Sequence, residues 1–89
     1  MAELHCIILF VRVKFTQSTR KHRVGRAHVF HVLENVEPRV TPATEHAAER
    51  REWIGPDDRG VELEIIGVVE PDYLLIIHVM PLHFRRGKR

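Results

Sequence analysis

Alternation of apolar and polar positions predicts several strands in this chain, and the last of them is the most apolar. Residues 73–80 are an apolar run that stops at Pro81. The run is far shorter than the roughly 20 residues that a helix needs to cross a bilayer, and it is rich in branched side chains, so we expect a strand. Strict alternation divides it into one face with Tyr73, Leu75, Ile77 and Val79 and another with Leu74, Ile76, His78 and Met80. Because only His78 is polar, the strand is predicted to be central and covered on both sides.

A second run, from Val61 to Val69, comes just before this strand. Its first half alternates strictly, so that Glu62 and Glu64 face away from the apolar positions. The intervening Glu70-Pro71-Asp72 has the composition of a turn. The two runs are therefore predicted to form an antiparallel hairpin.

The remaining elements follow from the same patterns. Strands are expected over 4–15 and 51–54, a short helix over 18–22, a second helix over 26–35 and a turn over 55–60. The second helix should end at Glu37-Pro38. Residues 39–41 are at most a brief extended piece, and residues 43–50 fit either a helical turn capped by Thr44 or a loop.

These elements predict a single α+β domain over residues 1–89, with a basic tail at 85–89. One strand and one or two helices precede a three-stranded meander. The last strand needs a partner on its free edge, and the N-terminal strand is the best candidate. The expected result is a four-stranded sheet with its helices on one face.

Composition excludes several classes of protein. The single cysteine, Cys6, lies in an apolar run and cannot form an internal disulfide. The histidines and this cysteine lack zinc-ligand spacing, and no glycine-rich phosphate loop occurs, so neither a metal nor another cofactor is expected. The N-terminus does not have the features of a signal peptide, and no membrane association is expected, which predicts a cytoplasmic protein.

Charge is unevenly distributed along the chain. The formal net charge is +2, yet residues 34–72 contain 11 of the 12 acidic side chains and only 4 of the 14 basic ones. The basic positions outside that segment are concentrated before residue 27 and after residue 84. We expect them to bind RNA or an acidic protein, although charge runs also occur simply as solvated surfaces. The predicted binding residues are Arg20, Arg23, Arg26, His83, Arg85 and Arg86.

Four segments resemble the BrnT-type toxins, which are small members of the RelE/ParE toxin superfamily of type II toxin–antitoxin systems. The segments are Lys21-His22-Arg23-Val24, Arg51-Glu52-Trp53-Ile54-Gly55, Asp57-Asp58-Arg59-Gly60-Val61-Glu62-Leu63 and Leu75-Ile76-Ile77-His78-Val79-Met80-Pro81. The resemblance implies a RelE-like fold, an endoribonuclease that inhibits translation on free or ribosome-bound mRNA, and a cognate antitoxin partner. Members of that family usually have Ser-Ala-Arg where this chain has His78-Val79-Met80. The oligomeric state is left open.

Metal-free RNA cleavage needs a base for the 2′-hydroxyl, an acid for the leaving oxygen and cations for the phosphate. Lys21, His22 and Arg59 offer these groups, and His78 offers a further acid or base on a rigid strand. These four residues are the predicted catalytic set. The structural alternatives are an exposed helix end for His22, a turn residue for Arg59 and a satisfied core histidine for His78.

Other combinations are weaker. His28 and His31 could share a metal on one helix face, but no third ligand is indicated. Trp53, Tyr73 and Phe84 could stack on bases, although aromatic residues in strands of a small domain usually belong to the core. Two function classes therefore remain, a toxin-type endoribonuclease and a non-catalytic module that binds nucleic acid or an antitoxin.

Overall fold

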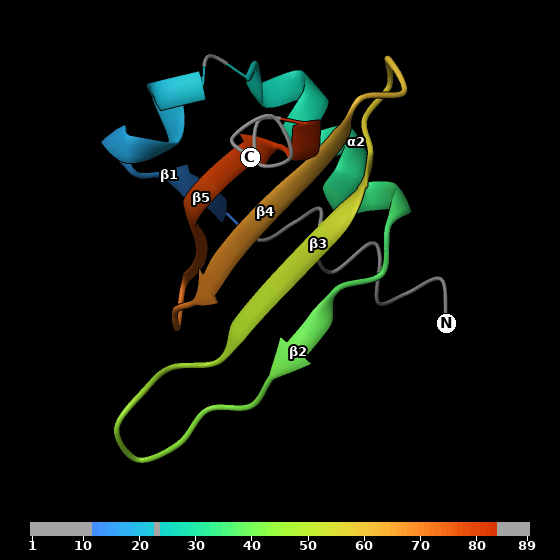
Figure 1. The fold of residues 1–89 in the computed structure, drawn as a ribbon. Coiled ribbons are helices and arrows are strands. Elements are labelled where there is room, and N and C mark those ends of the chain that lie inside the picture. Colours follow the sequence, from blue (N-terminus) through green and yellow to red (C-terminus); the bar gives the residue numbers. More distant parts are fainter. Residues whose placement is uncertain (1–11, 23, 84–89) are drawn as a thin grey trace.

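The computed structural model describes residues 12–22 and 24–83, which form a five-stranded mixed sheet with one α-helix and one 3-10 helix (Figure 1). In chain order the elements are β1 (Arg12–Phe15), η1 (Gln17–His22), α2 (Arg26–Asn35), β2 (Arg39–Thr41), β3 (Arg50–Pro56), β4 (Glu62–Val69) and β5 (Tyr73–Pro81). The sheet order is β1-β5-β4-β3-β2. The predicted α+β class is confirmed, but the sheet has five strands rather than four because the short β2 pairs with β3.

The predicted hairpin is present, and its second strand is internal to the sheet. β4 and β5 pair antiparallel, and β1 runs parallel to β5 on the other side, with Arg12 opposite Tyr73 and Phe15 opposite Ile76. The N-terminal strand is therefore the partner of the last strand, as expected, for residues 12–15. The remainder of the strand predicted over residues 4–15 lies outside the described residues.

A β-bulge changes which side chains of β5 share a face. His78 is opposite Ile66 and Ile76 is opposite Gly67, so Ile77 is an extra residue on β5. Leu74 and Ile76 are buried before the bulge, and Val79 and Pro81 are buried after it. The strictly alternating faces predicted from the sequence are therefore wrong beyond Ile76, and His78 shares a face with Tyr73 and Leu75.

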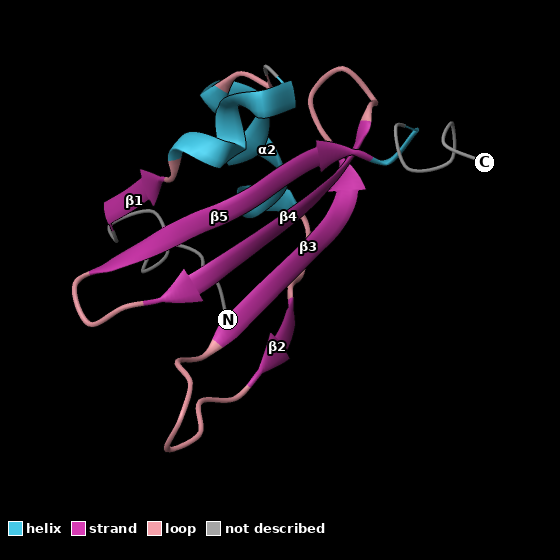
Figure 2. Ribbon diagram, turned by 60° about the vertical axis from the view of Figure 1, so that its left-hand side comes forward, coloured by secondary structure: helices cyan, strands magenta, loops and turns pink. Residues whose placement is uncertain are grey.

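Helix α2 covers one face of the sheet, which we call the covered face, and contacts β3 and β4 (Figures 1 and 2). Its Val29, Val32 and Leu33 join a buried cluster with strand residues. The strand members of that cluster are Trp53, Leu63, Ile65, Leu74, Ile76 and Val79. Because this cluster contains the only tryptophan and eight buried aliphatic side chains, it is the main source of hydrophobic stabilisation.

We call the other side of the sheet the open face. By register it presents Arg12, Lys14, Arg39, Thr41, Arg50, Glu52, Ile54, Pro56, Glu62, Glu64, Ile66, Val68, Tyr73, Leu75, His78 and Met80. Tyr73, Leu75, Ile66 and Val68 are half-buried there. The second cover predicted for β5 is not found in residues 12–22 and 24–83.

The segment between β2 and β3 forms a loop, which decides between the two readings left open for residues 43–50. Residues 42–48 are all exposed, and the loop extends away from the sheet at the lower end of Figure 1. Thr44 stabilises it locally, since its backbone N–H donates to Ala47 O at 2.8 Å and its Oγ1 accepts from His46 N at 3.1 Å. Across the described ranges, no helix is long and apolar enough to cross a membrane.

Candidate functional site

A histidine and a carboxylate are paired on the open face. His78 Nε2 of β5 lies 3.2 Å from Glu64 Oε1 of β4. The side chains are 36% and 17% exposed, respectively. His78 is therefore partly exposed and pairs with a carboxylate, whereas the structural alternative considered for it was a core histidine that a backbone group satisfies. A partly exposed histidine and a largely buried carboxylate thus lie side by side on two internal strands, and these are residue types that general acid–base catalysis uses.

The register of the hairpin brings the two groups together. Glu64 is opposite Met80 and His78 is opposite Ile66, so the two residues are diagonal neighbours on one face. The bulge at Ile77 is essential, because without it His78 would point to the covered face. Central strands hold both Cα atoms in place, which limits the reorganisation that a reaction would require.

The cations of the open face lie towards its two edges. On the β2 side, Arg39 lies 3.8 Å from Glu52, and this exposed pair contributes little to stability. On the β1 side, Lys14 is opposite Leu75, the last open-face residue of β5 before the bulge and His78. Lys14 is thus a basic residue of the open face on the strand next to that of His78.

Arg59, predicted as catalytic, is instead part of a locked turn between β3 and β4. Its Nε and Nη2 donate to Asp57 Oδ2 at 3.1 and 2.7 Å. Asp57 Oδ1 also accepts the backbone N–H groups of Arg59 and Val61, at 2.8 and 3.1 Å. Gly60 closes the turn with a φ of 84°, a conformation that glycine adopts without strain. Arg59 and His78 are not brought together, and the turn role considered for Arg59 is the one observed.

The Asp57 carboxylate is 3% exposed. Burial opposes its ionisation, but hydrogen bonds from the Arg59 side chain and from the backbone N–H groups of Arg59 and Val61 outweigh it. The net result is a pKa of Asp57 below its usual value. Asp57 is therefore a charged structural residue that organises the turn.

We predict that replacing Asp57 with alanine destabilises the protein more than replacing Arg59 with alanine. Asp57→Ala leaves two backbone N–H groups of the turn without their acceptor, which should lower the free energy of unfolding by about 1–3 kcal/mol. In a domain of this size, each kcal/mol lowers Tm by roughly 4–8 °C. Arg59→Ala removes a half-exposed guanidinium but leaves the Asp57 carboxylate with both of its backbone N–H donors, so we expect a smaller loss of stability. Thermal unfolding of both variants measures the difference, and equal losses would contradict the turn-organising role.

The same carboxylate makes stability depend on pH. Since its pKa is lower in the folded than in the unfolded state, its stabilisation is present above about pH 4 and disappears as the pH falls through the folded value. The Asp57→Ala variant should therefore lose less stability than the wild type on acidification.

His28 of α2 joins the helix to this turn. Its Nδ1 lies 2.5 Å from Asp58 Oδ1, and this hydrogen bond is the main cause of a lowered pKa of Asp58. Asp58 also places a negative charge near the first turn of α2, which has no acidic residue of its own.

Donor atoms of His28, Asp57 and Asp58 lie within 4.8 Å of one another, a spacing compatible with a metal ion. A cation would have to compete with the Arg59 guanidinium for Asp57, so the cluster is better explained as a structural clamp. The metal pair considered from the sequence, His28 with His31, is replaced here by the pairing of His28 with Asp58.

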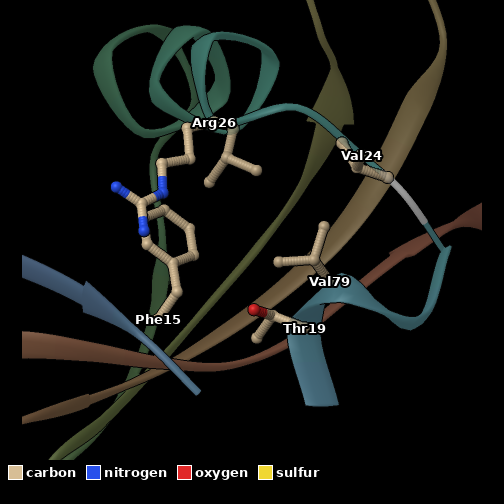
Figure 3. A pocket seen from close by; sticks show the side chains of 6 residues that line it. Phe15, Thr19, Val24, Arg26 and Val79 are labelled. Carbon is tan, nitrogen blue, oxygen red and sulfur yellow. The ribbon is translucent and has the colours of Figure 1, made fainter. Parts of the chain in front are cut away.

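The structure describes the other predicted basic residues only in part. The backbone of Lys21 and His22 ends η1, as expected, but the side chains of Arg20, Lys21 and His22 and residues Arg23, Arg85 and Arg86 lie outside the described part of the chain. His83 is exposed just beyond β5. A small pocket lies on the covered face between η1, α2 and β5 (Figure 3). Its lining residues are Phe15, Thr19, Val24, Arg26, Val29 and Val79.

At the edge of this pocket, the Arg26 guanidinium lies 5.0 Å from the centre of the Phe15 ring, so this cation contributes to packing as well as to surface charge.

For Glu64 and for the aromatic residues Trp53 and Tyr73, the structure adds to what the sequence indicated. Glu64 was not among the predicted site residues, and the turn alone could not have indicated it, because Glu64 shares a face with His78 only through the bulge at Ile77. Trp53 is fully buried and cannot stack on a base, whereas Tyr73 is half-buried on the open face.

Comparisons of this chain with protein-family models, with curated proteins and with solved structures found no match.

Proposed function

We propose that this protein is the toxin component of a type II toxin–antitoxin system and cleaves RNA without a metal ion, using Glu64 and His78. The observation that supports this most directly is the pairing of the partly exposed His78 with Glu64 on the open face. Of the predicted catalytic residues, His78 keeps its role in this proposal. Glu64 is added as the base, and Arg59 is left out of the proposed set because its guanidinium is held by Asp57.

The proposed chemistry follows from the two side chains. Glu64 accepts the proton of a ribose 2′-hydroxyl, the 2′-oxygen attacks the adjacent phosphorus, and His78 donates a proton to the departing 5′-oxygen. The products are a 2′,3′-cyclic phosphate and a 5′-hydroxyl end. A phosphate bound on the open face, above β4 and β5, would have Glu64 on the side of the 2′-oxygen and His78 on the side of the departing 5′-oxygen.

The order of the elements also supports the proposal. One strand and two helical segments precede a meander, and the first strand lies beside the last. This is compatible with the RelE-like fold that the sequence resemblance implies. In the proposed system a cognate antitoxin neutralises the protein by binding its basic flanking segments, and the protein acts in the cytoplasm.

Inducible expression in bacteria tests this function. We expect wild-type expression to stop growth and to fragment cellular RNA, and co-expression of a small protein encoded by an adjacent gene to relieve both effects. Normal growth with intact RNA would contradict the toxin assignment. The protein would then be better described as a non-catalytic binding module, in line with the absence of the usual family arginine beside His78.

A further inference from the structure

An aromatic ring and two cations lie together at the β1 edge of the open face. Lys14 Nζ is 4.4 Å from the centre of the Tyr73 ring. Arg12 is directly opposite Tyr73 in the parallel β1–β5 pairing. Both basic residues are exposed, while Tyr73 is half-buried. Within residues 12–22 and 24–83, neither Arg12 nor Lys14 forms a salt bridge.

This arrangement is on the same face as the acid–base pair only because of the bulge at Ile77. The bulge puts His78 on the side of Tyr73 and Leu75 rather than on the side of Leu74 and Ile76. At about 3.3 Å per residue, Tyr73 and His78 are roughly 16 Å apart along β5. In Figure 2, β1 lies beside the part of β5 that contains Tyr73, so the cations and the ring border the same strand.

Charge is distributed asymmetrically across the open face. Towards β2 and β3, Arg39 is close to Glu52. Towards β1, Lys14 lies over the Tyr73 ring and Arg12 is opposite that residue, and neither cation forms a salt bridge within residues 12–22 and 24–83. Arg12 and Lys14 therefore give the β1 edge of the open face a positive charge, which attracts a polyanion that lies along β5.

We propose that Tyr73, Lys14 and Arg12 form a subsite for single-stranded RNA, in which a base stacks on Tyr73 and the two cations bind neighbouring phosphates. The choice of RNA rests on the proposed function. Lys14 now covers the ring as a cation, and its flexible stem allows it to move onto a phosphate when a base replaces it. Stacking needs an unpaired base, so the subsite selects single strands over duplexes and engages nucleotides some way from the cleaved bond.

The test uses the full chain and a short fluorescent 2′-O-methyl RNA, which cannot be cleaved because its 2′-oxygens are blocked. Fluorescence anisotropy measures binding of the single strand and of its duplex over a range of salt concentrations. We expect tighter binding of the single strand, roughly 5- to 100-fold weaker binding by Tyr73→Leu, and near wild-type binding by Tyr73→Phe.

Lys14→Gln and Arg39→Gln form a matched pair of variants, because each removes one exposed cation from an opposite edge of the open face. Lys14→Gln should reduce the slope of log affinity against log salt by about 0.7, the value for one phosphate contact on a single strand. Arg39→Gln should leave that slope unchanged. Equal effects of the two variants would contradict the location of the subsite.

Photo-crosslinking covers the case in which Tyr73→Leu does not fold. A 5-iodouridine-containing single strand should crosslink to Tyr73 in the wild-type protein, and crosslinks found only elsewhere would overturn the proposal, as would equal affinity for single strand and duplex. The experiments distinguish failure of the proposed RNA subsite from failure of the proposed nuclease function. RNA cleavage in cells without Tyr73-dependent binding removes the subsite alone, and Tyr73-dependent binding without cleavage removes the nuclease alone.

Discussion

Replacing His78 with glutamine is expected to lower the rate of RNA cleavage by about 10²- to 10⁴-fold, which is the usual contribution of one positioned acid or base. Glutamine retains a hydrogen-bonding side chain of similar reach but cannot donate a proton in this way. Glu64→Gln should have an effect of similar size, and the double variant should be little worse than either single one, because the two groups act in one step.

Growth on induction and the rate of RNA loss measure this effect. His46→Gln is the matched control, since it makes the same replacement at an exposed position in the loop between β2 and β3. The unfolding midpoint of His78→Gln should stay close to that of the wild type, because the side chain it removes is half-exposed. Full toxicity of a folded His78→Gln variant would contradict the assignment of His78.

Replacing Gly55 with alanine is expected to destabilise the fold strongly, although it adds a single methyl group. A Cβ at this position would lie 2.6 Å from Cγ2 and 3.2 Å from Cγ1 of Val36, at the C-terminal end of α2. Val36 is β-branched, so it cannot easily rotate away. The overpacking should cost about 1–3 kcal/mol, which corresponds to a decrease of roughly 4–24 °C in Tm for a domain of this size.

A double-mutant cycle isolates this contact. Val36→Ala removes both clashing methyl groups, so Gly55→Ala should cost less in the Val36→Ala protein than in the wild type. If the stability losses of the two substitutions simply add, the account is contradicted, because α2 would then not approach β3 at Gly55 as closely as described.

The main elements could be predicted from the sequence because their patterns are local. The helix over 26–35 and the hairpin of β4 and β5 follow from hydrophobic periodicity and from the Pro71 turn. The boundaries of β3 were less accurate, since residues 50–56 include a glycine and a proline at one end. β2 was only weakly indicated, because a three-residue edge strand has too few positions to show a pattern.

The faces of β5 could not be predicted in full. Strict alternation assumes that every residue advances the pleat by one step, and a bulge inserts a residue that breaks this phase. An isoleucine at position 77 does not by itself indicate a bulge. The consequence is functional, since the phase change is what places His78 beside Glu64.

The candidate site was only partly predictable for a related reason. The residue types suited to RNA cleavage were recognised, but their partners depend on long-range register. Arg59 was assigned to the phosphate from its charge, whereas Asp57, two residues earlier, holds its guanidinium. Glu64 was read only as the polar side of a strand, because its proximity to His78 appears only after β4 and β5 are aligned.

Mapping of RNA 5′-hydroxyl ends after brief induction tests the central claim most directly, because attack by the 2′-oxygen leaves that chemical end. The account predicts new 5′-hydroxyl ends in cells that express the wild type or His46→Gln, and their loss with His78→Gln and Glu64→Gln. The same set of new ends in all four strains, or growth arrest by the wild type without new 5′-hydroxyl ends, would contradict it.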